Sequence, residues 1–161
     1  MKKIRIYILL LVLCVTNAVA QSPIEAFLNT PQELCPYFND AQRNAIGQQL
    51  VVAMRENDTT VLRPVPNLFG QESRPLSLTE KSLCLQIAEG IEYDWLVGNG
   101  TIIMIETLCS PICASVVSEY SIDWKFIRNI QPNKEGVFVR ATIDNDQLVF
   151  IDETPKEKFV D

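Results

Sequence analysis

The chain has 161 residues, of which 14 are basic and 20 acidic, and it contains no histidine. Without histidine the chain cannot form Ser-His or Cys-His nucleophile pairs, and it also lacks the commonest metal ligand. The formal charge of −6 makes nucleic acid and anionic lipid poor partners for the surface.

The first 20 residues have the pattern of a secretory signal peptide. A basic start precedes the apolar residues 6–15, a run too short to cross a membrane, and Ala18-Val19-Ala20 supplies the small residues of a cleavage site. Cleavage would remove three of the 14 basic residues and no acidic one, so the mature charge would be 11 − 20 = −9. We expect an exported protein of the periplasm or cell surface that starts at Gln21 and has no membrane span after cleavage.

Residues 21–155 have a length that suits one domain with a single core. The charged residues 156–161 are expected to form a frayed tail. Ser22 and Glu25 have the spacing of a capping box with a proline between them, which predicts a short helix to about Asn29.

A second cap, Asn39 with Gln42, begins the main predicted helix, which runs to Asn57. Apolar residues recur along it at helical spacing. We expect this amphipathic helix to lie across a sheet, with its Gln and Arg residues in solvent. The apolar positions are Ile46, Leu50, Ala53 and Met54.

Beyond Thr59 the pattern changes to the alternation of strands. Residues 60–62 are predicted as a short strand, which the following prolines restrict to an edge or a connection. Residues 67–73 are predicted as a loop with Phe69 turned inward. Alternating apolar residues then predict an antiparallel meander, and residues 128–136 are predicted as a polar loop before a final hairpin. The expected strands cover residues 76–78, 83–87, 91–97, 101–108, 114–122, 137–143 and 148–151.

These elements predict an α+β fold, with one main amphipathic helix packed on an antiparallel β-meander of five to seven strands. The cysteines bear on both fold and function. Cys35, Cys84, Cys109 and Cys113 would remain after cleavage, and an even number in an exported chain favours disulfides. Cys109 and Cys113 flank a short hairpin turn, where opposed Cα atoms lie close enough to bridge. The second expected pair is Cys35 with Cys84.

A redox role for Cys109 and Cys113 is the alternative to a structural bridge. Redox-active pairs usually have two intervening residues and lie at a helix start, where the thiol pKa falls. Here three residues intervene between two predicted strands, which favours the structural bridge. Zinc bound by four thiolates is disfavoured because only one cysteine pair is close in sequence, and we expect neither a metal nor a cofactor.

Four aromatic residues near the meander allow a glycan-binding surface. Tyr93 and Trp95 alternate with polar residues on one strand, which favours a place in the core. Trp124, at a strand end, is predicted to be the freer ring. With Tyr120, it forms the candidate binding pair.

Several segments together resemble an uncharacterised family of exported Bacteroidales proteins, domain-of-unknown-function family 3256. The segments are Phe27-Leu28 with Pro31, Leu34-Cys35-Pro36-Tyr37, Asn67-x-Phe69-Gly70-Gln71-Glu72-Ser73, Cys109-x-Pro111-x-Cys113 and Asp123-Trp124. The family carries no assigned activity, so the resemblance implies no catalytic residue. It does imply an O-glycosylation site at Thr59, because Asp58-Thr59-Thr60 is similar to the sites modified in such periplasms.

Three function hypotheses follow. The first is an exported, non-enzymatic binding or assembly module with a protein or glycan partner in the cell envelope, based on the export pattern, the acidic surface and the missing catalytic groups. The second is a thiol–disulfide protein acting through Cys109 and Cys113. The third is a carbohydrate-binding module that uses Tyr120 and Trp124.

Overall fold

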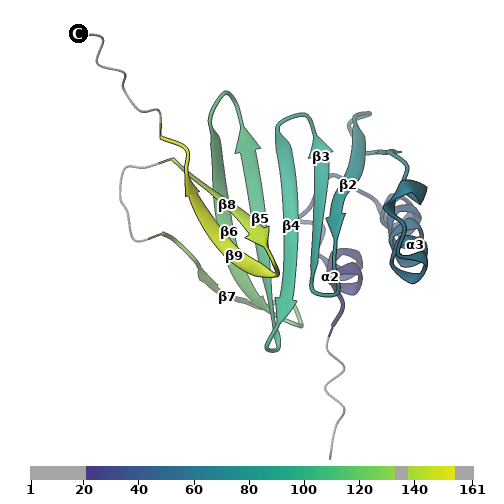
Figure 1. Ribbon diagram of the computed structural model, residues 1–161, viewed down its shortest axis with the longest axis horizontal. Helices are drawn as coiled ribbons and strands as arrows, with labels where there is room; N and C mark the ends of the chain where they lie inside the picture. Colours follow the sequence, from purple (N-terminus) through teal and green to yellow (C-terminus); the bar gives the residue numbers. More distant parts are fainter. Residues whose placement is uncertain (1–20, 133–137, 155–161) are drawn as a thin grey trace, which may run out of the picture.

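The computed structural model describes residues 21–132 and 138–154. The predicted signal peptide and charged tail lie outside these residues. Within them, a seven-stranded antiparallel sheet carries helices on one face and a two-stranded hairpin on the other (Figure 1). We call these two sides the helix face and the hairpin face.

Both helices begin at the predicted capping boxes. Helix α2 spans Pro23–Asn29, and α3 spans Asp40–Glu56. In each, the side chain of the N-cap residue accepts a hydrogen bond from the N3 backbone, and the N3 side chain accepts one from the N-cap backbone. Asn57 ends α3 in the left-handed conformation, where its φ is 51°.

The packing of the helices differs from the prediction. The short helix α2 lies against strands β3 (Ser82–Ala88) and β4 (Ile91–Gly98). The long helix α3 packs instead on α2, on the 3₁₀ helix η1 (Thr59–Val61) and on the edge strand β1 (Val65–Pro66). Gly47 permits this arrangement because it has no side chain. A Cβ atom at this position would lie 2.8 Å from the Leu28 side chain and would clash with it. The two helices therefore approach each other closely, and α2 is the one that covers the centre of the sheet.

The prediction that the Arg residues of α3 face solvent is wrong for Arg43, because this residue is only 4% exposed. Its guanidinium donates hydrogen bonds to the backbone carbonyls of Phe27, Thr30 and Cys35. A buried charge of this kind requires such partners. Arg43 thus joins α3 to the end of α2 and to the loop that follows it.

The main sheet follows chain order from β1 to β7, and β8 pairs only with β9. The predicted meander and final hairpin are confirmed. The strands are β1 Val65–Pro66, β2 Glu72–Leu78, β3 Ser82–Ala88, β4 Ile91–Gly98, β5 Thr101–Cys109, β6 Cys113–Ser121, β7 Phe126–Asn129, β8 Val139–Asp144 and β9 Gln147–Asp152.

Three local predictions are wrong. Residues 59–61 form a 3₁₀ helix rather than a strand, because the Asp58 side chain accepts a hydrogen bond from the Thr60 backbone and caps the turn. Phe69 is 66% exposed instead of buried. Part of the predicted loop is strand β7, which pairs with β6 at the edge of the sheet.

The two faces have separate cores. Tyr93, Trp95 and the alternate apolar residues of β3 belong to the main core on the helix face, so the core prediction for these two rings is confirmed. On the hairpin face, Ile105 and Val117 pack with Ala141 of β8. This placement of the final hairpin covers a surface that would otherwise expose apolar side chains.

Candidate functional site

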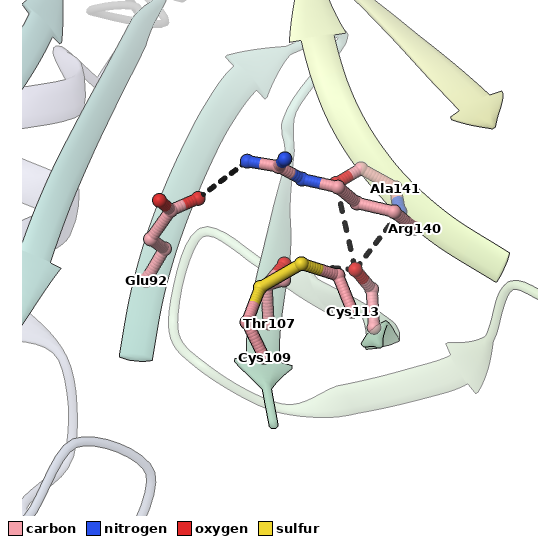
Figure 2. Close-up of a disulfide and its surroundings, with 7 residues drawn as sticks. Glu92, Thr107, Cys109, Cys113, Arg140 and Ala141 are labelled. Carbon is pink, nitrogen blue, oxygen red and sulfur yellow. Dashed lines mark hydrogen bonds and ion pairs between the residues drawn. A yellow bond between two sulfur atoms is a disulfide. The ribbon is translucent and has the colours of Figure 1, made fainter. Parts of the chain in front are cut away.

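Cys109 and Cys113 form a disulfide, as predicted (Figure 2). They are the last register pair of β5 and β6. Gly90 lies beside this turn, and the Cys109 backbone N–H donates to its carbonyl over 2.8 Å. The bridge therefore closes a strand end that is also tied to the start of β4. The redox hypothesis stays untested.

The predicted bridge between Cys35 and Cys84 is wrong, since both are free thiols. Cys35 is buried in the core of the helix face. Cys84 alternates with the buried Leu83 and Leu85 along β3, so its side chain lies on the hairpin face. The sheet separates the two sulfur atoms. Burial raises the pKa of Cys35 to about 11, which makes it a poor nucleophile.

Cys84 belongs to a cluster of ionisable groups beneath the hairpin. It lies opposite Asp94 in the register of β3 and β4, and its thiol donates a hydrogen bond to that carboxylate. Asp94 is 5% exposed, and burial raises its pKa to about 6. Next to it, Glu92 forms a 2.8 Å ion pair with Arg140 of β8, as Figure 2 shows. This cluster attaches the hairpin to the sheet.

The strongest candidate for a ligand site is a cleft on the helix face, which we call the tyrosine cleft. It has a volume of about 230 Å³ and lies between β4, β5, β6 and the loop joining α2 to α3. Three tyrosines and one central carboxylate converge in it. Its lining residues are Glu33, Leu34, Pro36, Tyr37, Tyr93, Met104, Glu106, Val116, Ser118 and Tyr120.

Strand register places the floor of the cleft. Glu106 of β5 lies opposite Tyr93 on β4 and opposite Val116 on β6. Side chains directly opposite each other in an antiparallel sheet share a face and touch. Ser118 and Tyr120 follow Val116 on the same face of β6, because alternate residues of a strand point to the same side.

The loop after α2 supplies the remaining wall. The Tyr37 ring lies 5.9 Å from the Tyr93 ring, at an interplanar angle of 67°. Its carbonyl accepts a 2.9 Å hydrogen bond from the Leu68 backbone, and Arg43 donates to the Cys35 carbonyl over 2.8 Å. Two backbone anchors therefore hold Tyr37 in position.

The electrostatic character of the cleft is acidic. Glu33 and Glu106 line it, and within residues 21–132 and 138–154 no Lys or Arg does. Burial and a hydrogen bond to Glu106 raise the pKa of Tyr93, so its hydroxyl stays protonated and donates to the carboxylate. Burial and the charge of Glu106 also raise the pKa of Tyr37. The cleft thus presents two carboxylates beside the neutral phenols of Tyr37 and Tyr93.

The predicted pair Tyr120 and Trp124 lies together, with ring centroids 5.4 Å apart. Tyr120 is 8% exposed and lines the cleft. Trp124 is the freest of the four rings, as predicted: it is half-buried against the main core, whereas Tyr93, Trp95 and Tyr120 are buried. Its indole N–H is buried without a hydrogen-bond partner among the described residues. Phe126, 59% exposed and 5.9 Å from Tyr120, is the more open ring.

Other site predictions have mixed outcomes. Thr59 is exposed on η1 and so is open to modification, but its glycosylation stays a prediction. Over the described ranges 21–132 and 138–154, no group of three or more His, Cys, Asp or Glu residues could hold a metal ion. Across those same residues, neither helix is long and apolar enough to cross a membrane.

Comparison with known proteins places the chain in a family. The family described as "Protein of unknown function (DUF3256)" matches residues 15–157. The chain belongs to DUF3256. No curated protein matches it. A solved structure of a domain of an uncharacterized protein from Porphyromonas gingivalis W83 is similar, with 14% sequence identity, a TM-score of 0.60 and 80% of each chain covered. At this identity the likeness shows the fold of the DUF3256 chain and nothing of its activity.

Sequence reasoning missed two central residues of the cleft in this DUF3256 protein, Tyr37 and Glu106. Glu106 could have been found by pairing strands outward from the cysteine turn, since the register then sets it between Tyr93 and Val116. No such signal existed for Tyr37, because its position depends on the tertiary packing of a loop.

Proposed function

We propose that this DUF3256 protein is an exported, non-enzymatic binding module of the cell envelope, and that it binds a protein partner through the tyrosine cleft. The observation that carries the proposal is the convergence of Tyr37, Tyr93 and Tyr120 around Glu106 in one open cleft. Tyrosine is enriched at protein interfaces because it offers apolar area and a polar tip at small entropic cost. Export rests on the signal-peptide pattern of the sequence.

The surroundings of the cleft favour a protein partner over a glycan chain. Phe69 packs against Tyr37 with ring centroids 5.6 Å apart, and Phe126 packs against Tyr120. Both phenylalanines are more than half exposed, so apolar area flanks the cleft on both sides. Exposed apolar groups beside a polar pocket are typical of protein-binding surfaces. A volume of about 230 Å³ is also below that of most small-molecule pockets and suits one inserted side chain.

The proposal can be tested by site-specific photo-cross-linking in the native envelope. Val116 lines the cleft and is 59% exposed, so a photoreactive phenylalanine analogue at position 116 would face a bound partner. Val149 on β9, 36% exposed on the hairpin side, is the matched control. We expect a discrete protein adduct from position 116 and none from position 149. Identical adducts from both positions, or none from position 116, would refute the proposal.

A further inference from the structure

The geometry points to the chemical group that the tyrosine cleft accepts: we infer that it binds the ammonium group of a lysine side chain presented by the partner protein. This inference rests on the proposed function and deepens it. Three features of the described residues carry it, namely the charge of the cleft, its hydrogen-bond acceptors and its apolar walls.

The charge of the cleft selects a cation. Among the residues that the structure describes, two carboxylates line it and no basic side chain does. Glu106 lies at the centre, opposite Tyr93 in the strand register. A carboxylate in a partly enclosed cleft, without a cationic partner among the lining residues, attracts a cation more strongly than one in open solvent. The negative net charge of the chain, −6, also attracts cations over longer distances.

The acceptors match an ammonium group, which has three N–H donors and no acceptor. The Tyr93 hydroxyl donates a hydrogen bond to Glu106 and keeps its proton, so its oxygen lone pairs can still accept a hydrogen bond. The Glu106 carboxylate, the Tyr93 oxygen and the Ser118 hydroxyl, all on the helix face, provide one acceptor for each donor. Tyr37 and Tyr93 meet at 67° and form an aromatic corner, and aromatic faces attract cations.

The walls of the cleft suit the stem of lysine. Leu34, Met104 and Val116 line it next to the carboxylate, and the four methylene groups of lysine can lie along such surface while the charged end reaches a polar group. Met104 is buried and Val116 is exposed, so the apolar wall runs from the floor of the cleft to its rim. A side chain that enters past Val116 would reach Glu106 with its charged end.

The test uses Nα-acetyl-L-lysine N-methylamide as the probe, followed by NMR of the tyrosine ring signals. We expect saturable shifts of the Tyr37, Tyr93 and Tyr120 rings that weaken as NaCl concentration rises, because salt screens the attraction. The same compound acetylated on its ε-amine is the uncharged control and should cause no such shifts. Equal binding of the two compounds would overturn the inference.

Glu106→Gln keeps the size of the side chain and removes its charge. We expect it to raise the Kd of the lysine probe by about tenfold, as the loss of a charge-assisted hydrogen bond would. Glu89→Gln, which removes an exposed carboxylate outside the cleft, should leave the Kd unchanged. A folded Glu106→Gln protein that binds the probe as the parent does would also overturn the inference. The proposed function is tested separately, because an adduct at position 116 does not depend on this probe.

Discussion

At the scale of single residues, Asp94 gives the fold a pH dependence. Burial and, less strongly, the nearby Glu92 raise its pKa, whereas the Cys84 hydrogen bond and Arg140 lower it, and together they bring the pKa from 3.8 to about 6. A carboxyl whose folded pKa exceeds its unfolded value favours folding in its protonated form. Its stabilising contribution is therefore full below about pH 4, near the unfolded pKa, and is lost as the pH rises through about 6.

Asp94→Asn should remove this dependence. At pH 4 the variant and the parent should have similar free energies of unfolding, because a protonated carboxyl resembles an amide. Above pH 7 the variant should be more stable by up to about 3 kcal/mol, the free energy that corresponds to the pKa difference. Urea unfolding of the variant and the parent from pH 4 to pH 8 measures the free energy of unfolding at each pH. Asp123→Asn, at an exposed position, is the control. A stability difference that does not change with pH would contradict this assignment.

Arg43 is the second residue whose environment matters beyond its own position. Replacing it with Met would leave the carbonyls of Phe27, Thr30 and Cys35 without its hydrogen bonds. We expect a loss of about 3 kcal/mol or more in the free energy of unfolding. Arg55→Met, at an exposed position of the same helix with an ion pair to Glu56, should cost less than about 1 kcal/mol. Similar losses from both variants in urea unfolding would show that the buried contacts of Arg43 contribute little.

At the scale of elements, two glycines allow a matched comparison. Gly90 and Gly100 both have a left-handed backbone, with φ of 74° and 76°. A Cβ at Gly90 would lie 2.6 Å from the Cys109 carbonyl oxygen, whereas nothing lies within 4 Å at Gly100. The start of β4 and the cysteine turn are therefore in direct backbone contact.

Gly100→Ala should cost about 1–2 kcal/mol for the backbone conformation alone. Gly90→Ala should cost more, about 3 kcal/mol or above, because the strand ends must also move apart. Thermal or urea unfolding of the two variants measures the difference. Equal losses would mean that the contact between Gly90 and Cys109 is not tight in solution.

The elements also show what local sequence decides. Both capping boxes were predicted from four residues each, because a cap depends only on nearby backbone and side chains. The strands followed from alternation, and Asn99 and Gly100, which join β4 to β5, are residue types that tolerate the positive φ found there. Strand β7 was missed because its exposed residues carry no alternating pattern.

At the scale of the whole molecule, predictions failed where they depended on which face of the sheet a segment covers. The expected bridge between Cys35 and Cys84 contradicts the parity of β3, in which Leu83 and Leu85 point toward the helices and Cys84 points away. This alternation can be read from the sequence, so the sequence alone could have excluded the bridge. The position of the β8–β9 hairpin, and the loop that brings Tyr37 to Tyr93, depend on tertiary packing and carry no local signal.

In the function that we propose, the tyrosine cleft binds a partner protein in the envelope through Glu106. The most direct test of this proposal is the yield of the cross-linked adduct at position 116 in three backgrounds: the parent, Glu106→Gln and Glu89→Gln. We predict a clear adduct in the parent and in Glu89→Gln, and a yield lower by about tenfold in Glu106→Gln, because the central charge is lost. An adduct of equal yield in all three backgrounds would contradict the role of Glu106, and no adduct in any of them would contradict the cleft as a binding site.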